Sequence, residues 1–344
     1  MKVSIIGTTG YGGGELIRLL RNHPIFTIHS IHTTRDEVPI SDEYPHLSDI
    51  FEKRLEKVDP EKIAEQSQIV FLATPSGISG KLAASFADKN IQVVDLSGDL
   101  RLKNPEDYES WYKREPAAET LVSKAVYGLS EWNRESIQKS TLVANPGCFP
   151  TATLLGLAPV TIQNVINPAS IIIDAKTGVS GAGRSLSKGM MFAEVNENLR
   201  IYKVNEHQHT PEIEQQLKLW NSGCGPITFN THLLPITRGI MTTMYVQLTD
   251  NLNTAALIDL YKETYKDQPF VRIRKNGIYP SVKEVSGSNY CDIGLNADSR
   301  TGRLTIVSVI DNLMKGAAGQ AVQNANIMNG LPETTGLEIV PLYP

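Results

Sequence analysis

One cysteine stands where the chain can activate it as a nucleophile. Cys148 lies in residues 145–151 (NPGCFPT), where Pro150 predicts the start of a helix that continues through three leucines. We expect the thiol to lie just before that helix, whose N-terminal partial positive charge favours the thiolate. Cys224 and Cys291 lie in a glycine-rich turn and in a strand-like run, and they lack this activation. An inert cysteine that fills the core is the alternative interpretation of Cys148.

Two histidines precede another predicted helix. The order His207, His209, Thr210 places both imidazoles on the loop that enters it, within reach of a cleft, with Thr210 as the expected N-cap. An imidazole there suits acid/base catalysis, oriented by a carboxylate such as Glu206 or Glu212. A metal site is a rival interpretation, but the sequence offers no third ligand at a convincing spacing. A purely structural histidine pair is another.

A glycine-rich turn near the N-terminus predicts a dinucleotide site. Gly7, Gly10 and Gly13 have the spacing GxxGxxG, directly after the apolar run 3–6 and before a helical pattern. Glycines there allow a tight turn and let backbone N–H groups approach a pyrophosphate, which the helix N-terminus attracts. A glycine-rich turn without a ligand is the alternative interpretation.

The residues after the second expected strand favour NADP(H) over NAD(H). An NAD site usually carries an acidic residue about 20 residues past the glycine turn. Thr33, Thr34 and Arg35 stand there instead, and hydroxyls with a guanidinium suit a 2′-phosphate. Asp36 argues the other way, and a solvated loop charge is the alternative interpretation of Arg35. A further glycine-rich loop, 178–184 (GVSGAGR), is placed to close over a nicotinamide.

Strand and helix signals alternate in the first half of the chain, whereas strand signals dominate the second half. The apolar runs of the first half lie at 3–6, 27–31, 69–73 and 91–96. Such runs between helices predict a parallel sheet covered on both faces. The strand-like runs of the second half lie at 171–175, 227–234, 241–248, 271–274, 290–295 and 304–310. They predict a mostly antiparallel sheet with helices near 149–158, 211–220 and 254–266 packed on it.

The composition excludes several classes of protein. The chain has 344 residues with 33 Lys and Arg against 37 Asp and Glu, a net charge of −4, which argues against a nucleic-acid binder. No apolar run approaches the roughly 18–20 residues of a membrane span, and the N-terminus lacks the apolar segment of a signal peptide. Three cysteines make no disulfide framework, so a cytoplasmic location is expected.

Seven stretches together resemble the N-acetyl-γ-glutamyl-phosphate reductases, and the resemblance extends over the whole chain. They are residues 7–16 (GTTGYGGGEL), 95–101 (DLSGDLR), 145–151 (NPGCFPT), 178–184 (GVSGAGR), 207–215 (HQHTPEIEQ), 234–239 (LPITRG) and 311–324 (DNLMKGAAGQAVQN). Gly12 departs from the family, which often has threonine there. The cysteine and histidine motifs are the specific ones, since many dehydrogenases share the glycine turn.

The resemblance implies an α/β fold like that of aspartate-semialdehyde dehydrogenase. A Rossmann domain would span 1–147, completed by 316–344, whose helix at 316–329 returns to it. An α+β catalytic domain with a mostly antiparallel sheet would span 148–315. The family also tends to form homo-oligomers, dimers or tetramers.

The resemblance further implies roles for individual residues. Cys148 is the expected nucleophile, His207 the acid/base group and Arg101 the contact for the substrate phosphate; for Arg101, a surface charge beside Asp99 is the alternative. His209 and Glu212 are expected at the substrate. The expected cofactor contacts are Gly7, Thr9, Gly10, Tyr11, Gly12, Gly13, Thr33, Thr34, Arg35, Ser180, Gly181 and Asn312.

We therefore expect NADPH-dependent reduction of N-acetyl-L-glutamyl 5-phosphate to N-acetyl-L-glutamate 5-semialdehyde. Phosphate is released, and the reaction passes through a thioester on Cys148 as a step of arginine biosynthesis. The same chemistry on aspartyl phosphate, or on the carrier-linked aminoadipyl phosphate of lysine biosynthesis, is the alternative within enzymes. An NADP(H)-binding sensor without turnover is the alternative from another class, and it leaves Cys148 and the histidines without a role. Neither a metal nor a nucleic acid or membrane partner is expected.

Overall fold

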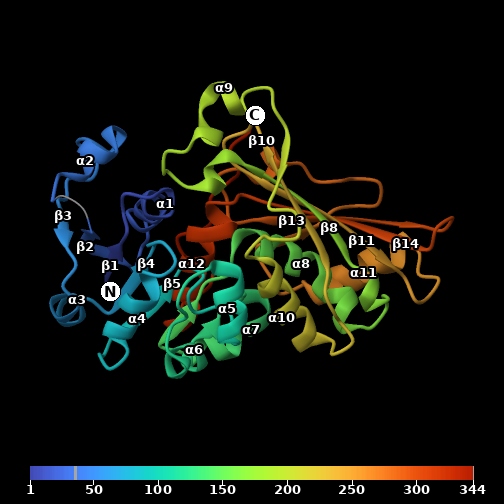
Figure 1. Cartoon of the computed structure of the whole chain (residues 1–344), viewed down its shortest axis with the longest axis horizontal. Helices are drawn as coiled ribbons and strands as arrows, with labels where there is room; N and C mark the ends of the chain where they lie inside the picture. Colours follow the sequence, from blue (N-terminus) through green and yellow to red (C-terminus); the bar gives the residue numbers. More distant parts are fainter. Residues whose placement is uncertain (35–36, 344) are drawn as a thin grey trace. The chain divides into compact units, whose positions relative to one another are not determined.

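A computed structural model describes residues 1–34 and 37–343 of the chain (Figure 1). The chain forms two compact units. The first unit contains residues 1–147 and 317–338, and the second contains residues 148–316 and 339–344. Of the residues 316–344 that were expected to complete the first unit, Gly316 and residues 339–343 belong to the second unit instead. The backbone N–H of Leu342 donates to the carbonyl of Ser286, which ties this end of the chain to the second unit.

The first unit is built on a parallel sheet of seven strands in the order β3-β2-β1-β4-β5-β7-β6. The strands are β1 Lys2–Ile6, β2 Thr27–Thr33, β3 Leu55–Lys57, β4 Ile69–Leu72, β5 Gln92–Asp95, β6 Val126–Tyr127 and β7 Leu142–Ala144. All their pairings are parallel. The strand order reverses between β1 and β4, and such a reversal is where open α/β sheets bind ligands. The doubly wound prediction is confirmed, although the sequence patterns missed the two- and three-residue strands.

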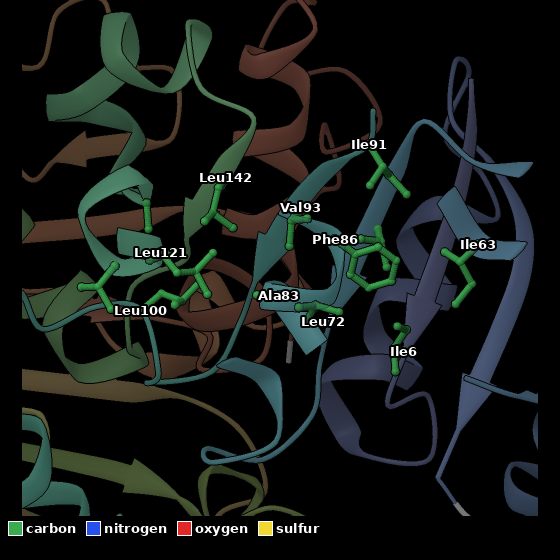
Figure 2. Close-up of a cluster of buried hydrophobic side chains, with 14 residues drawn as sticks. Ile6, Ile63, Leu72, Ala83, Phe86, Ile91, Val93, Leu100, Leu121 and Leu142 are labelled. Carbon is green, nitrogen blue, oxygen red and sulfur yellow. The ribbon is translucent and has the colours of Figure 1, made fainter. Parts of the chain in front are cut away.

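Helices cover this sheet because its strands are apolar on both faces. The helices of this unit are α1 Tyr11–Leu20, α2 Ile40–Glu43, α3 Pro60–Gln66, α4 Ser79–Phe86, α5 Pro105–Tyr112, α6 Glu119–Lys124, α7 Ser130–Gln138 and α12 Gly319–Met328, of which the short α2 lies away from the sheet (Figure 1). Every residue of β4 is buried, and Leu72 joins Ile63 of α3 and Phe86 of α4 in one apolar cluster (Figure 2). A side chain of this size contributes about 1.5–3 kcal/mol when fully buried, so the cluster fixes the helices on the sheet.

Helix α12 returns to the first unit and supports the chain just before Cys148. All ten of its residues are buried. The Asn324 amide donates to the carbonyl of Gly128 at 2.8 Å and to Oδ1 of Asn145 at 3.0 Å. The Asn145 amide donates in turn to the carbonyl of Ala317 at 3.1 Å. Since buried amides need these partners, the turn that leads into Cys148 is held on both sides by the returning segment.

The second unit is built on a mixed sheet of seven strands in the order β12-β13-β14-β11-β8-β10-β9. The strands are β8 Ile172–Gly178, β9 Arg200–Tyr202, β10 Thr228–Leu234, β11 Ile240–Gln247, β12 Val271–Ile273, β13 Cys291–Asp298 and β14 Arg303–Ile310. Four pairings are antiparallel, and β8 with β10 and β12 with β13 are parallel. Burial alternates along β11, so helices cover one face only. The mostly antiparallel prediction is confirmed.

Three helices cover that face: α8 Cys148–Ile162, α10 Thr210–Trp220 and α11 Thr254–Thr264. Helix α8 is buried on all sides from Phe149 to Thr161, as expected for a central helix. The hydroxyls of Tyr261 on α11 and of Tyr265, the residue after that helix, donate at 2.6 Å to the carbonyls of Gly156 and Leu155 in α8. This packing leaves α8 little freedom and so fixes its first residue, Cys148. No helix in the described part of the chain is long and apolar enough to cross a membrane.

Candidate active site

The glycine turn after β1 has the geometry of a dinucleotide cradle. Gly7 has φ of +91°, and a Cβ there would lie 2.5 Å from the carbonyl oxygen of Ala73. A Cβ on Gly13 would lie 2.5 Å from the carbonyl oxygen of Gly7. Gly10 is the N-cap of α1, whose first turn holds no acidic residue. The turn therefore brings backbone N–H groups and a positive helix end to one place, as a pyrophosphate requires.

Gly12 differs from Gly13 in the space around it, which allows a matched test. No atom of the described residues lies within 4 Å of a Cβ built on Gly12. We expect Gly13→Ala to weaken NADP⁺ binding at least about tenfold, because the added methyl displaces the turn that must contact the pyrophosphate. Gly12→Ala should leave the affinity within about twofold. Fluorescence titration with NADPH measures both, and equal affinities in the two variants would refute the cradle.

The end of β2 carries the residues expected to select the cofactor. Thr33 is buried at the last position of β2, and Thr34 is exposed. Arg35 and Asp36 lie outside the described residues. Elsewhere on the turn, Thr9 is half-buried and Tyr11 is exposed as the first residue of α1. The preference for NADP(H) therefore stays a prediction.

Cys148 is the first residue of α8, so the helix begins two residues earlier than predicted. Pro150 falls within the first turn, where the missing N–H of proline costs no hydrogen bond. The Cys148 side chain is half-buried, whereas Cys224 and Cys291 are buried. The Cys291 thiol lies 3.3 Å from the Ser308 hydroxyl. Among the cysteines, Cys148 alone combines a helix start with partial exposure, as a reactive thiolate needs.

Gly316 lies directly against the backbone of Cys148. A Cβ on Gly316 would be 2.8 Å from the Cβ and 3.3 Å from the Cα of Cys148. Gly316 belongs to a π-helical turn, Met314–Ala318, that ends where α12 begins. Such turns are frequent at functional sites. The close approach makes Gly316 a positioning residue for the thiol, which the sequence patterns did not single out.

We expect Gly316→Ala to lower kcat at least about tenfold, because a shift of about 1 Å in a reacting group costs up to about 10²-fold. The KM for substrate should change less, since the added methyl meets Cys148 itself. Gly225→Ala is the matched control, because a Cβ built there has no atom of the described part of the chain within 4 Å. Steady-state kinetics of both variants, with melting temperatures to verify folding, checks this. An unchanged kcat in folded Gly316→Ala would contradict the positioning role.

His207 lies on the loop before α10, as predicted, but a box of aromatic rings surrounds it there. Only 4% of it is exposed. Four other rings surround its imidazole. The distances between ring centroids are 5.3 Å to Phe149, 5.8 Å to Tyr202, 5.6 Å to Phe229 and 4.8 Å to His209. Because Phe149 follows Cys148 in α8, the box places the imidazole next to the start of that helix.

The backbone, and not a carboxylate, sets the orientation of the His207 ring. The backbone N–H of His209 donates to Nδ1 of His207 at 3.1 Å. An accepting Nδ1 leaves the proton of the neutral ring on Nε2. The prediction that a carboxylate binds and orients this ring is therefore wrong for Nδ1. Of the two candidates, Glu206 is exposed and Glu212 is buried in the first turn of α10. Burial, with a smaller contribution from the Lys203 charge, lowers the pKa of His207 to about 3.

This lowered pKa predicts acid sensitivity. Below pH 6.5 His207 becomes protonated in the unfolded chain but stays neutral in the folded chain. The free energy of unfolding therefore falls by up to about 1.4 kcal/mol for each pH unit, down to about pH 3. Burial lowers the pKa of His23 and His32 too, with the same sign. We expect the melting temperature to fall from pH 6.5 to 4.5, and less steeply in His207→Gln. The exposed His46, changed to Gln, is the control; equal slopes in all three proteins would contradict the assignment.

The residues around α10 differ in detail from the prediction. Thr210 is the first residue of the helix and His209 the residue before it, so Thr210 is not the N-cap. The Thr210 hydroxyl is buried without a hydrogen-bond partner. His209 is buried, and its ring lies 6.0 Å from that of Phe149. Burial thus brings His209 to the box with His207, while Glu212 lies at the start of the same helix.

Arg101 is a buried cation in the first unit. Its Nε donates to the carbonyl of Asn145 and its Nη2 to the carbonyl of Leu96, each at 2.8 Å. Asp99 instead accepts from the N–H of Gly80 at 2.7 Å and from the hydroxyl of Tyr108 at 2.7 Å. The alternative of a surface charge beside Asp99 is therefore wrong. Arg101 supports the turn that precedes Cys148 and brings a permanent charge to it.

The loop after β8 and Asn312 form a second group in the second unit. The Asn312 amide donates to the Ser180 hydroxyl at 2.9 Å, and its Oδ1 accepts from the N–H of Gly239 at 2.8 Å. A Cβ on Gly181 would lie 3.9 Å from the same amide. Three of the expected cofactor residues are thus neighbours, although they come from distant parts of the chain. Among the described residues, no cluster of three or more histidines, cysteines or carboxylates is arranged to hold a metal.

Sequence reasoning missed three members of the site: Tyr202, Phe229 and Gly316. Tyr202 lies on β9, and burial, with a smaller contribution from the charge of Cys148, raises the pKa of its phenol. Phe229 is one of several apolar residues on β10 and is not distinguished by type or spacing. For Tyr202, its closeness to the histidines along the chain is the one signal that could have drawn attention to it.

The comparisons with known proteins agree on one family. A family described as "Semialdehyde dehydrogenase, NAD binding domain" matches residues 2–140, and "Semialdehyde dehydrogenase, dimerisation domain" matches residues 148–312. Proteins named N-acetyl-gamma-glutamyl-phosphate reductase from Geobacillus sp. (strain WCH70) and Bacillus subtilis (strain 168) are each 55% identical over 345 residues, which is 100% of both chains. The resemblance seen in the motifs is confirmed.

Solved structures support the fold. Aspartate semialdehyde dehydrogenase II from Vibrio cholerae has a TM-score of 0.72 and 17% identity, over 96% of this chain and 98% of that one. Aspartate semialdehyde dehydrogenase with NADP from Candida albicans has a TM-score of 0.66 and 16% identity, over 95% and 98%. These likenesses establish the fold, in which a parallel sheet with helices is joined to a second sheet.

Proposed function

The chain belongs to the N-acetyl-γ-glutamyl-phosphate reductases of the semialdehyde dehydrogenase family, and from this premise we propose what it catalyses. The reaction is the reversible, NADPH-dependent reduction of N-acetyl-L-glutamyl 5-phosphate to N-acetyl-L-glutamate 5-semialdehyde with release of phosphate. It is a step of arginine biosynthesis. The single observation that carries the proposal is the half-buried thiol of Cys148 at the start of α8, next to an imidazole held in one orientation.

Cys148 performs the first half of the reaction. Its thiolate, favoured by the N-terminus of α8, attacks the carbonyl carbon of the acyl phosphate. The C–S bond forms, the C–O bond to the phosphate breaks, and inorganic phosphate leaves with the bonding electron pair and takes its proton from water. Arg101 steadies the charge of the leaving phosphate. A thioester on Cys148 remains, which divides one difficult displacement into two easier steps.

His207 acts in the second half as a hydrogen-bond donor. NADPH, when bound, supplies the hydride that side chains cannot supply. Reduction of the thioester gives an oxyanion on the carbon bonded to Cys148, and Nε2–H of His207 stabilises it. The oxyanion re-forms a C=O bond and expels the Cys148 thiolate, so the step consumes no proton. A neutral imidazole therefore suffices, which fits its buried position and lowered pKa.

The remaining parts of the proposal concern the cofactor and the assembly. The glycine turn fits a dinucleotide. Thr33 at the end of β2 and Thr34 after it support NADP(H) over NAD(H), because no acidic residue stands at those two positions. Ser180, Gly181 and Asn312 are proposed contacts of the nicotinamide, and His209 and Glu212 of the substrate. The protein acts in the cytoplasm as a homo-oligomer, a dimer or a tetramer.

The test compares acyl phosphates rather than asking only for activity. The purified enzyme should give the largest kcat/KM with N-acetylglutamyl phosphate, against aspartyl phosphate and carrier-linked aminoadipyl phosphate. In the reverse direction, NADP⁺ reduction by the N-acetylated semialdehyde should require phosphate. A preference for either other acyl phosphate would assign the chain to that reaction. If the protein binds NADPH tightly but turns over none of these acyl phosphates, it is an NADP(H)-binding sensor rather than an enzyme.

A further inference from the structure

The turn after β5 carries three consecutive buried residues with different surroundings. Leu100 lies in one apolar cluster with Leu72 at the end of β4 and Ala83 of α4 (Figure 2). Arg101, the next residue, donates to two backbone carbonyls. The residue before Leu100 is Asp99, whose side chain is also buried. The proposed reaction uses Arg101 but gives no role to this buried carboxylate.

The carboxylate of Asp99 caps the start of α4. Its two oxygens accept from the backbone N–H of Gly77 at 2.9 and 2.8 Å, and Oδ2 also accepts from the N–H of Gly80 at 2.7 Å. The hydroxyl of Tyr108 on α5 donates to Oδ1 at 2.7 Å. The first N–H groups of a helix need partners from outside it, and the apolar side chain of Ile78, the residue before α4, cannot accept. A carboxylate also suits the positive end of a helix.

A second buried carboxylate joins the same two segments. Asp95, the last residue of β5, accepts from the hydroxyl of Ser79, the first residue of α4. It also accepts at 2.9 Å from both the N–H and the hydroxyl of Ser97. In the other direction, the Ser76 hydroxyl accepts from the N–H of Gly98 at 3.3 Å. The start of α4 and the turn after β5 are therefore bound to each other at several points.

The loop between β4 and α4 lies directly against the glycine turn. A Cβ on Gly7 would lie 2.5 Å from the carbonyl oxygen of Ala73 and 3.0 Å from the backbone nitrogen of Thr74. The N–H of Ala73 donates to the carbonyl of Ile6 at 2.8 Å. Strands β1 and β4 pair with each other at the reversal of strand order. A displacement of this loop therefore moves the backbone that is proposed to hold the pyrophosphate.

We propose that Asp99 is a positioning residue that holds two binding elements of the first unit in place, the loop against the glycine turn and the guanidinium of Arg101. This rests on the proposed function, which assigns the dinucleotide to the glycine turn and a phosphate to Arg101. Asp99 holds the loop through the N–H groups of Gly77 and Gly80. It holds Arg101 because only Leu100, which is itself fixed in the core, separates the two residues.

Asp99→Asn tests the positioning role with almost no change in side-chain size. The amide turns one accepting atom into a donor, which then faces backbone N–H groups of the α4 end. Because buried donors without acceptors are unfavourable, the loop and the turn after β5 should move apart. We expect the KM for phosphate in NADP⁺ reduction to rise at least about tenfold, and the affinity for NADPH to fall at least about threefold. The value of kcat should change less, because the reacting groups are Cys148 and His207.

Phe86→Leu is the matched control for a loss of stability. Phe86 is the last residue of α4 and is buried, so the variant loosens the same helix at the end that Asp99 does not cap. It should lower the melting temperature but keep the KM for phosphate and the NADPH affinity within about twofold. If Asp99→Asn does not fold, Gly80→Ala takes its place. Its added methyl would lie 3.2 Å from Cβ and Oδ2 of Asp99, and alanine favours a helix. The KM for phosphate should then rise about two- to fivefold in a folded protein.

Steady-state kinetics, fluorescence titration with NADPH and melting temperatures decide the outcome. Folded Asp99→Asn with the wild-type KM and NADPH affinity overturns the proposal, and so does Phe86→Leu with the same losses as Asp99→Asn. Where Asp99→Asn does not fold, Gly80→Ala with the wild-type KM overturns it. A wild type without phosphate-dependent NADP⁺ reduction overturns the proposed function instead. The NADPH titration does not depend on turnover, so it still tests whether Asp99 holds the loop.

Discussion

Cys148→Ser should lower kcat of phosphate-dependent NADP⁺ reduction by at least about 10³-fold, as loss of a covalent nucleophile does elsewhere. Serine has nearly the shape of cysteine, but its hydroxyl ionises at a far higher pH, and a helix N-terminus does not make up that difference. The affinity for NADPH should change little, because the glycine turn that is proposed to hold the cofactor belongs to β1 and α1. Initial rates and a binding titration measure the two quantities on the same preparation.

A second thiol provides the control for this variant. Burial raises the pKa of Cys224, so Cys224→Ala should keep the wild-type rate within about twofold. Iodoacetamide should modify Cys148 first and inactivate the enzyme in proportion to that modification. If Cys148→Ser works at the wild-type rate, the reaction does not pass through a thioester. Direct reduction of the acyl phosphate would then be the mechanism.

His207→Asn should lower kcat about 10²–10³-fold, the usual cost of losing one hydrogen-bond donor to a developing oxyanion. The KM for substrate and the affinity for NADPH should change much less, because the donor acts on a charge that forms only during the reaction. His232→Asn is the control, since His232 lies on β10 with Nδ1 3.2 Å from the carbonyl of Ala175. The reverse pattern, a large loss of NADPH affinity with little change in kcat, would make His207 a binding residue.

The pH profile distinguishes a neutral donor from a protonated acid. With its pKa lowered to about 3, His207 is uncharged throughout the neutral range. We therefore expect kcat of wild type not to fall as the pH rises through 6.5 on account of His207. The His207→Asn variant should have the same dependence of kcat on pH in this range. If kcat of wild type falls as the pH rises through 6.5 and kcat of the variant does not, the imidazolium is the active form. His207 then donates its proton as an acid.

Local sequence determined the parts of this protein that depend on neighbours along the chain. A buried run followed by glycines and a helical pattern can form little else than the turn between β1 and α1, because Gly7 and Gly13 leave room for backbone alone. The alternating residues of β11 likewise specify a sheet with one covered face. The motif around Cys148 placed the thiol at a helix start to within two residues, because proline restricts where a helix begins.

Tertiary structure alone decided the environment in which these groups react. The rings around His207 are those of Phe149 on α8, Tyr202 on β9 and Phe229 on β10. Gly316, which is far from Cys148 in sequence, lies against it in the fold. No periodicity encodes such contacts, since each depends on how elements far apart in sequence pack. Burial then changed the chemistry. Both histidines lie on the predicted loop but are buried there, and a low-dielectric interior disfavours the charged form of the His207 imidazole.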